Sequence, residues 1–297
     1  CKEIAPGECF RTHRAFLRLR YGNVNDVCND FVHYQDARLS VPESEESMPV
    51  LFNEYCTTWG VPSEENISAI LDSIADIPFG IFVIDAGWYK PDHCDWGNAV
   101  GDWVPSKTLF PHGIKAVAEM IRTRGMRPGL WFEFENAGRD SAAFSRGEWM
   151  LRRDGETLTS KNRRFFDLRR EDVQAYLQER MCALLRRSGF SYIKIDYNDT
   201  FGMGCDGAES CGEGGRQVTE ESLAWLERLK KAAKDHGIKL NTEHAERFTY
   251  TDLDNIQIAR EGVPCVLIDL PLKYMHTTVE LLDMNVIREC GRLLAHF

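Results

Sequence analysis

Ser191-Tyr-Ile-Lys-Ile-Asp-Tyr-Asn198 is the stretch that decides the fold of this chain. Its β-branched and aromatic residues predict a short strand, on which the side-chain period of two places Lys194, Asp196 and Asn198 on one side. A cation, a carboxylate and an amide at a strand end are costly to bury for stability alone. The set suits a site that grips a polyhydroxylated substrate and attacks it with a carboxylate. The alternative is a structural ion pair.

Expected strands and helices alternate along the chain. The strands, rich in apolar residues, are 51–59, 79–84, 128–134, 192–196 and 238–241. The helices, predicted from apolar residues at helical spacing, are one capped by Ser63, then 113–124, 171–188 and 217–236. This alternation predicts parallel strands with helical crossovers, so the expected fold class is α/β, (β/α)8 TIM-barrel-like. A doubly wound open sheet is the competing fold, but the chain shows no glycine-rich first turn for phosphate.

Polar side chains gather just after the expected strands, where a (β/α)8 barrel carries its active site. They are Asp85, Trp88, Glu133, Glu135, Asp196, Asn198, Glu243 and His244. Several carboxylates suit the cleavage of a glycosidic bond, in which one carboxyl group attacks or activates water and another protonates the leaving group. Four tryptophans fit the apolar faces of sugar rings, with core or rim packing as the alternative for each. They are Trp88, Trp96, Trp103 and Trp131.

Composition excludes several classes of partner. The formal net charge of -10 and the pI of about 5.4 argue against nucleic acid and anionic membrane as partners. We find no apolar run that approaches the ~18 residues of a membrane span.

Ten cysteines without a Cys-x-x-Cys pair predict reduced cytoplasmic thiols. The N-terminus lacks a signal-peptide pattern, and a start at Cys1 rather than Met fits a fragment of a longer protein. The oligomeric state is not indicated.

Five motifs follow one another in a fixed order. They are Phe82-Val-Ile-Asp-Ala-Gly-Trp-Tyr89, Gly101-Asp-Trp103, Leu109-Phe-Pro-His-Gly-Ile-Lys115, Gly129-Leu-Trp-Phe-Glu-Phe-Glu135 and Lys194-Ile-Asp-Tyr-Asn198. Together they resemble the catalytic barrel of the melibiase-like α-galactosidases of glycoside hydrolase family 36, over about residues 50–235. The resemblance implies a retaining hydrolase of terminal α-D-galactosides on a (β/α)8 barrel. It also implies a small carbohydrate substrate and no metal or organic cofactor.

The resemblance also assigns roles to individual residues. It implies that Asp196 is the catalytic nucleophile and that Lys194 holds galactose hydroxyls beside it. Asp85 matches the first carboxylate of a paired acidic motif that grips the sugar, whereas the second carboxylate of that pair is Ala86 here. One sugar contact of the family is therefore absent or replaced in this chain.

Further substrate contacts are expected around this centre. Trp131 matches a galactose-stacking tryptophan, and residues 202–215 resemble the pocket-lining loop that follows the nucleophile strand. Arg163 and Arg164 fall near a family arginine, with the register left open. The remaining predicted substrate-binding residues are Asn198, Trp88, Trp103, Cys205 and Asp206.

The C-terminal part resembles a different family. The first resemblance ends near residue 235, before an acid/base aspartate is reached, and about residues 232–297 then resemble the end of the cocatalytic-metal glutamyl and deblocking aminopeptidases. The motifs that carry this are Thr251-Asp-Leu-Asp-Asn-Ile-Gln-Ile-Ala-Arg-Glu-Gly-Val-Pro264 and Leu267-Ile-Asp-Leu-Pro-Leu-Lys-Tyr-Met-His-Thr277. The second resemblance implies that His276 is a metal ligand. A rim or core position is the favoured interpretation, because no other ligands of a metal pair are visible.

The expected organisation has three parts. Residues 1–50 form an irregular segment or linker, 51–237 a glycosidase-like (β/α) barrel portion, and 238–297 a foreign βα segment with a strand over 265–270. Fewer than eight βα units fit, so the barrel is expected to be incomplete. A natural fusion, a rearranged gene, an engineered chimera and an assembly artefact all fit two incomplete enzymes joined in one chain.

The predicted function is retaining hydrolysis of α-galactosides, impaired because no acid/base carboxylate is identifiable. Retention needs a second carboxyl group about 5–5.5 Å from the nucleophile. The candidates are Glu243, Glu246, Asp252, Asp254 and Asp206. A metallo-aminopeptidase-like fragment and a non-catalytic sugar-binding remnant are the alternative functions.

Overall fold

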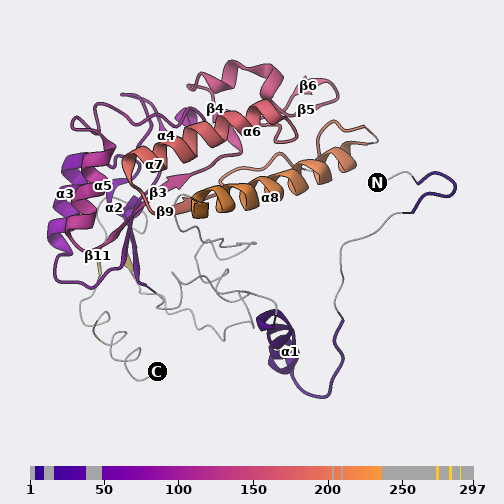
Figure 1. Cartoon of the computed structure of the whole chain (residues 1–297), viewed down its shortest axis with the longest axis horizontal. Helices are drawn as coiled ribbons and strands as arrows, with labels where there is room; N and C mark the ends of the chain where they lie inside the picture. The colour runs from indigo at the N-terminus through magenta and orange to yellow at the C-terminus, as the bar shows by residue number, and fades with distance from the viewer. Residues whose placement is uncertain are drawn as a thin grey trace. The chain divides into compact units, whose positions relative to one another are not determined.

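The computed structural model of the chain describes residues 4–9, 17–37, 49–202, 204–208, 210–235, 272–273, 281–282 and 288. The chain divides into two compact units (Figure 1). The first consists of Cys1–Phe10 with Ser47–Asn241, and the second of Arg11–Glu46 with Thr242–Phe297. Each unit is considered by itself below.

A four-stranded parallel sheet forms the centre of the first unit. Its strands are β1 (Leu51–Asn53), β2 (Ile81–Ile84), β3 (Arg127–Phe132) and β9 (Tyr192–Ile195), in the order β1-β2-β3-β9. The apolar strand β2 is buried along its whole length, as expected for a strand covered on both faces. Four of the five predicted strands are thus confirmed as parallel neighbours, and the fifth, over 238–241, lies outside the described residues.

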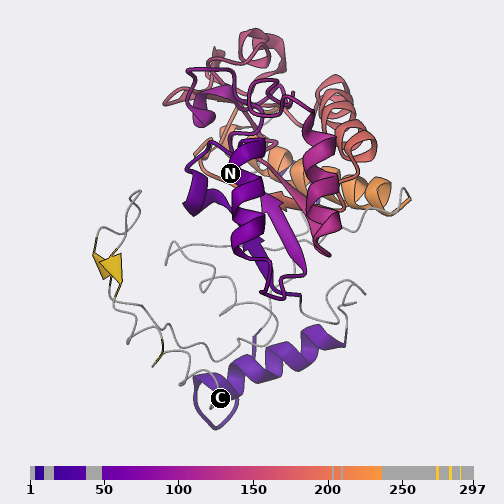
Figure 2. The same ribbon diagram turned by 90° about the vertical axis from the view of Figure 1, so that its left-hand side faces the viewer.

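Helices connect these strands. They are α3 (Glu64–Ser73), α5 (Ile114–Thr123), α6 (Glu171–Gln178) and α7 (Leu184–Ser188), and the π-helical segment Glu179–Ala183 joins α6 to α7. Ser63 caps α3, because its hydroxyl accepts a hydrogen bond from the Asn66 amide at 3.1 Å. In the turned view, the helices follow one another around the sheet from α3 to α8 (Cys211–Asp235) (Figure 2). The predicted strand over 51–59 is too long, since the short helix α2 (Tyr55–Thr58) begins directly after Glu54.

A long excursion between β3 and α6 was not predicted as ordered structure. It contains the three-stranded antiparallel sheet β4-β8-β7, made of β4 (Asn136–Gly138), β7 (Thr159–Ser160) and β8 (Arg163–Phe165). It also contains a hairpin of β5 (Arg152–Arg153) and β6 (Glu156–Thr157), and two 3-10 turns, Ala143–Ser145 and Gly147–Trp149. Another short helix, α4 (Trp96–Ala99), follows β2. These short elements stand at the carboxyl ends of the parallel strands.

Helix α8 packs on the parallel sheet and starts six residues earlier than predicted. Trp225 is only 3% exposed and its ring lies 4.7 Å from that of Phe134, just beyond the end of β3. Leu229 belongs to the same apolar core, and Arg228 donates a hydrogen bond to Gln174 on α6 at 2.8 Å. Burial of this apolar stripe holds α8 against the first unit.

The second unit contains a helix where an irregular segment was expected. Helix α1 (Val24–Asp36) lies within the predicted linker 1–50, so the prediction of irregular structure there is wrong. Arg18 and Arg20 both pair with Asp30 of this helix, at 2.5 and 2.9 Å. The strands β10 (Leu272–Lys273) and β11 (Leu281–Leu282) pair antiparallel. The predicted strand over 265–270 and His276 lie outside the described residues.

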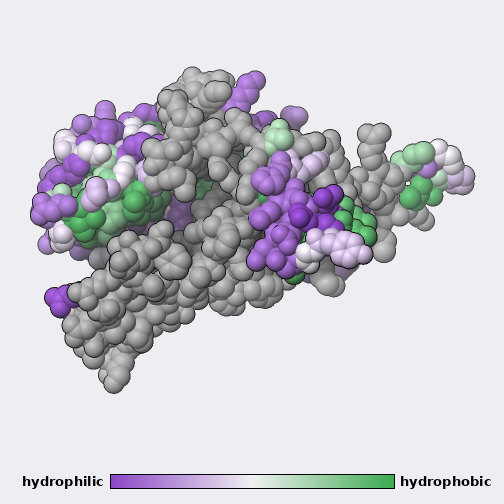
Figure 3. Space-filling model, turned by 90° about the horizontal axis from the view of Figure 1, so that it is seen from below, coloured by the Kyte–Doolittle hydropathy of each residue, from purple (hydrophilic) through white to green (hydrophobic). Residues whose placement is uncertain are grey.

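In the described ranges the parallel sheet has four strands and does not close into a barrel. Across these same ranges, no helix combines the length and apolar character required for a membrane span. On the face shown in Figure 3, one group of hydrophobic side chains is flanked by hydrophilic ones. An open groove of about 480 Å³ lies between β1 and α3, with Phe52, Ile70 and Ile74 among its lining residues.

The packing of α8 gives a first testable prediction. Replacing Trp225 by Ala should lower the free energy of unfolding by about 3–5 kcal/mol, because a large buried ring is removed from the core. Leu223→Ala on the same helix is the matched control, since Leu223 is 48% exposed, and it should cost less than about 0.5 kcal/mol. Urea unfolding followed by far-ultraviolet circular dichroism measures both. Equal losses for the two variants would show that α8 does not pack on the sheet.

Candidate active site

Parallel pairing brings three predicted site residues to one level of the sheet. Trp131 of β3 is in register with Lys194 of β9, and Leu130 is in register with Ile84, the residue before Asp85. Asp85, Trp131 and Lys194 therefore occupy corresponding positions on adjacent strands, and the Lys194 Nζ lies 3.0 Å from Asp85 Oδ2. Asp85 and Lys194 are separated by 109 positions in the chain, so only the sheet topology brings them together.

The Asp85 carboxylate is almost fully buried and is surrounded by donors. Its Oδ2 accepts hydrogen bonds from Asn53 Nδ2 at 2.8 Å and from Lys194 Nζ, while Oδ1 accepts from the Ala86 amide at 2.8 Å. Asn53 ends β1 and escaped the sequence reasoning, because the expected strand ran through it to residue 59. A polar Asn-Glu pair inside an otherwise apolar run was the available signal that the strand ends there.

Glu54 is the second residue that the sequence reasoning missed. Its side chain is 0% exposed, and it accepts hydrogen bonds from the Asp85 amide at 2.7 Å and from the Thr58 hydroxyl. Burial raises the pKa of Glu54 to about 7, against the opposing effect of these two hydrogen bonds. Glu54 thus binds the backbone amide of Asp85, and its raised pKa leaves it partly protonated around neutral pH.

Asp196 follows β9 and is held in a defined orientation. Its Oδ2 accepts a hydrogen bond from Trp131 Nε1 at 3.0 Å, and its Oδ1 accepts from the Tyr197 amide at 2.9 Å. The Asp196 amide donates to the Phe132 carbonyl at 2.9 Å, which continues the sheet by one residue. The carboxylate is partly exposed, so it is oriented and accessible at once.

The predicted sugar-stacking tryptophans are core residues in this structure. Trp88, Trp103 and Trp131 are each 0% exposed, so none offers a ring face to a sugar. The ring of Trp131 is covered by Tyr89 at 6.0 Å, and Trp88 Nε1 donates to the Trp131 carbonyl at 2.9 Å. The packing alternative therefore holds for these three rings, because the loops after β2 and β3 cover them. Trp131 retains a polar contact with Asp196 through its indole N–H.

A buried carboxylate, Glu133, organises the start of the loop that follows Asp196. It is 0% exposed and accepts from Arg163 Nη1 at 2.6 Å and from Asn136 Nδ2 at 2.8 Å. Asn198 donates to it twice, from its amide at 3.0 Å and from Nδ2 at 3.1 Å. Burial raises the pKa of Glu133, while the Arg163 charge opposes this shift. Arg163 is thus the arginine that faces this site, whereas Arg164 packs over the Phe144 ring, 4.1 Å from its centroid.

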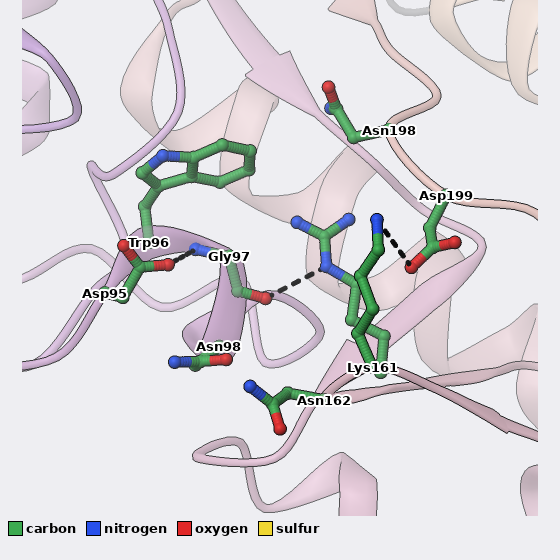
Figure 4. A pocket seen from close by; sticks show the side chains of 9 residues that line it. Asp95, Trp96, Gly97, Asn98, Lys161, Asn162, Asn198 and Asp199 are labelled. Atoms are coloured by element: carbon green, nitrogen blue, oxygen red, sulfur yellow. Dashed lines mark hydrogen bonds and ion pairs between the residues drawn. The ribbon is translucent and has the colours of Figure 1, made fainter.

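A polar pocket of about 380 Å³ lies beside this network (Figure 4). Lys161 Nζ and Asp199 Oδ2 are 3.9 Å apart in its wall, and Arg163 Nε donates to the Gly97 carbonyl at 3.1 Å. Trp96 is partly exposed here, unlike the three core tryptophans. The lining residues are Asp95, Trp96, Gly97, Asn98, Lys161, Asn162, Arg163, Asn198 and Asp199.

Cys205 and Asp206 were predicted to bind substrate, and the structure places them elsewhere. Cys205 is 0% exposed in a second apolar cluster with Leu151, Phe165 and Val218. The Asp206 carboxylate accepts from the amides of Asp154 and Gly155 at 2.7 and 2.9 Å. The prediction is corrected because their loop turns toward the β5–β6 hairpin. None of the described residues of the predicted loop 202–215 lines the polar pocket, whereas Asn198 and Asp199, which precede that range, do.

No group of three or more metal-ligating side chains is found where the structure describes the chain. The one predicted ligand, His276, lies outside those ranges.

Comparison with known proteins confirms the first of the two predicted family resemblances. Residues 9–208 match the family model described as Melibiase. The chain belongs to the melibiase family. The match begins well before residue 50, so it includes most of the segment that the sequence reasoning took for a linker. Residues 213–293 match a second model, M42 glutamyl aminopeptidase, which begins within α8 and earlier than the expected residue 232.

Two relatives of this chain are longer proteins. Alpha-galactosidase AgaA of Geobacillus stearothermophilus is 25% identical over 198 residues, which cover 66% of this chain and 27% of AgaA. Alpha-galactosidase Mel36A of Lactobacillus acidophilus is 26% identical over 200 residues, with the same shares. The chain therefore spans little more than a quarter of these relatives.

Solved structures show the same fold. The alpha-galactosidase from Lactobacillus brevis has a TM-score of 0.62 and 23% identity, covering 71% of this chain and 29% of that one. TtGalA from Thermus thermophilus, in complex with stachyose, has a TM-score of 0.54 and 22% identity, covering 80% and 52%. These likenesses confirm the predicted fold class, of which the four described parallel strands form one part.

The pKa of Glu54 predicts how stability depends on pH. The pKa is about 7 in the folded protein against a usual value of 4.5, so the folded state binds more protons between these two values. Stability should therefore fall as pH rises through this window, by on the order of 3 kcal/mol for this group. Glu54→Gln mimics the protonated form and should remove that part of the loss. Urea unfolding at pH 5.0 to 7.5 measures it.

Glu227→Gln on α8 is the control for this experiment, because Glu227 is exposed. It should leave the pH dependence unchanged. The same pH dependence in Glu54→Gln and the unmodified protein would contradict a protonated, buried Glu54.

Proposed function

We propose that this chain is part of the catalytic barrel of a glycoside hydrolase that acts on terminal α-D-galactosides with retention of configuration, with Asp196 as nucleophile. The observation that supports this most directly is the fixed orientation of the Asp196 carboxylate by Trp131 Nε1 and the Tyr197 amide at the end of a parallel strand. Catalytic groups occupy this position in barrels of this type. The relatives are named alpha-galactosidases, and solved structures of the family contain stachyose or raffinose.

The Asp85–Lys194 pair has a defined part in this proposal. The Lys194 side chain is 36% exposed and can donate to sugar hydroxyls beside the nucleophile. Asp85 already accepts three hydrogen bonds and is 3% exposed, so its role is to orient Lys194 more than to touch the sugar. This agrees with the family's paired acidic motif being reduced to Asp85-Ala86.

The polar pocket supports a sugar as ligand. Its lining offers the amides Asn98 and Asn162, the ammonium of Lys161 and the partly exposed ring of Trp96. Amide and ammonium groups can form hydrogen bonds with sugar hydroxyls in place of those they form with water. An aromatic ring fits the apolar face of a pyranose. Asn198 connects this pocket to the strand end that carries Asp196.

The proposal does not assign the acid/base carboxylate that would act with Asp196. Asp206 is unsuited to this role, since its carboxylate is bound to two backbone amides of the hairpin. The other predicted partners, Glu243, Glu246, Asp252 and Asp254, lie outside the described residues. An aryl galactoside with a good leaving group needs less help from an acid, so it is the substrate of choice for a test.

Release of nitrophenol from 4-nitrophenyl α-D-galactoside should fall at least ~1,000-fold in Asp196→Asn, because the nucleophile is lost while the side-chain shape is kept. Asp72→Asn is the control: Asp72 is an exposed residue of α3 paired with Arg124, and its replacement should leave the rate unchanged. An unchanged rate in Asp196→Asn refutes the proposal. Galactose binding by calorimetry without any turnover would instead support a non-catalytic sugar-binding protein.

The match of residues 213–293 favours a metallo-aminopeptidase as the second candidate function. This function requires at least one equivalent of zinc or cobalt per chain and chelator-sensitive cleavage of aminoacyl amides. We expect less than one equivalent in purified protein by inductively coupled plasma mass spectrometry. A full equivalent that is lost in His276→Ala would reverse the order of the two candidates.

A further inference from the structure

The loop between Asp196 and α8 has a defined position without belonging to the sheet. Residues 197–202 and 204–208 of this loop follow β9, and their Asn198 and Asp199 line the polar pocket. The side chain of Asp199 accepts from the Ser160 hydroxyl at 3.1 Å. The contacts that fix the remainder of this loop therefore affect the shape of the pocket.

One guanidinium holds two carbonyl groups of this loop. Arg153 Nη2 donates to the Phe201 carbonyl at 2.6 Å and to the Gly204 carbonyl at 2.5 Å, and its Nε donates to Gly204 at 3.0 Å. A planar fork can serve two acceptors at once, whereas the single ammonium of a lysine cannot reproduce that geometry. Arg153 is part-buried and lies on β5, about fifty residues before the loop in sequence.

The loop holds the hairpin in return. The turn of the β5–β6 hairpin consists of Asp154 and Gly155, with φ of 54° and 80°, and its two amides point to the Asp206 carboxylate at 2.7 and 2.9 Å. The Asp206 amide donates to the Arg152 carbonyl at 2.7 Å. The hairpin thus donates hydrogen bonds to the loop and also accepts them from it, so the two segments hold each other in place.

Apolar packing adds to this contact. The ring of Phe201 lies 6.1 Å from that of Phe165, in an edge-to-face arrangement, and Phe201 packs against the cluster that contains Leu151 and Cys205. The side chains of the loop that face away from the pocket are therefore tied to the excursion between β3 and α6. Asn198 and Asp199, at the start of the loop, have their own contacts with Glu133 and Ser160, so the attachment of Phe201 fixes the loop at its other end.

We propose that the β5–β6 hairpin is a clamp for the pocket loop and that Arg153 is a positioning residue for substrate binding. Arg153 does not touch the substrate in this proposal. It fixes the carbonyls of Phe201 and Gly204, and through the loop it sets the places of Asn198 and Asp199 in the pocket wall. The inference rests on the proposed hydrolysis of α-galactosides.

Two variants of Arg153 and one neighbour test the clamp. Arg153→Ala removes all three hydrogen bonds, and Arg153→Lys keeps the charge without the fork. Arg152→Ala is the matched control on the same strand: Arg152 is exposed, its carbonyl contact with Asp206 is kept, and its side chain donates within the hairpin, to the Gly155 carbonyl at 3.3 Å. Circular dichroism first establishes that each variant is folded, and Arg153→Lys serves where Arg153→Ala does not fold.

The expected results concern kinetics and amide exchange together. For 4-nitrophenyl α-D-galactoside, KM should rise about tenfold in Arg153→Ala, with a smaller change in kcat, because binding geometry is lost while Asp196 stays in place. Arg153→Lys should be intermediate, and Arg152→Ala should stay within twofold of the unmodified enzyme. Hydrogen–deuterium exchange should be faster in peptides covering 152–158 and 197–208 in the Arg153 variants, and the change over 197–208 should be absent from Arg152→Ala. A merely structural role of Arg153 elsewhere would not produce this paired change.

The outcomes separate this inference from the proposed function. Unchanged exchange over 197–208 in a folded Arg153→Ala overturns the clamp, and faster exchange with an unchanged KM overturns the role in substrate binding. An unmodified enzyme that hydrolyses no α-galactoside contradicts the proposed function instead. In that case the exchange experiment still decides whether Arg153 clamps the loop.

Discussion

The parallel pairing of β2, β3 and β9 is the constraint on which the rest of the site depends. It sets Asp85, Trp131 and Lys194 at one level, so that a carboxylate, an indole and an ammonium meet at the strand ends. Lys194 then pairs with Asp85, and the Trp131 indole N–H donates to Asp196, directly after the end of β9. A register shift by one residue would turn these side chains to the opposite face and would dissolve the site.

Several carboxyl groups around the site are removed from water in this arrangement, which disfavours their charged form. Burial raises the pKa of Glu54 and of Glu135 to about 7, and it raises the pKa of Glu133 as well. Three carboxyl groups that resist ionisation within one small region are typical of functional sites more than of structural cores. Each of them is compensated by hydrogen bonds, from Thr58, from Asn198 or from Tyr197, so the region is polar and ordered at the same time.

The family boundary and the structural boundary of this chain do not coincide. The melibiase match ends at residue 208 and the aminopeptidase match begins at 213, within α8. Yet α8 packs on the melibiase sheet through Trp225 and Leu229, and the first unit continues to Asn241. A helix that matches one family therefore completes the apolar core of the other. The hydroxyl of its Ser222, which donates to the Val218 carbonyl at 2.9 Å, also opposes the rise that burial causes in the pKa of Glu135 beside the site.

Local pattern alone predicted the sites of the four described parallel strands, the helical segment at 171–188 and the cap at Ser63, because period and capping depend only on near neighbours in sequence. Tertiary structure decided what that pattern could not. It ended β1 at Asn53 and selected Arg163 over Arg164. It also buried Trp88, Trp103 and Trp131, and it turned Asp206 toward a hairpin fifty residues earlier. The exposure of a ring or the partner of a carboxylate depends on which distant segment covers it, and that is a property of the folded chain.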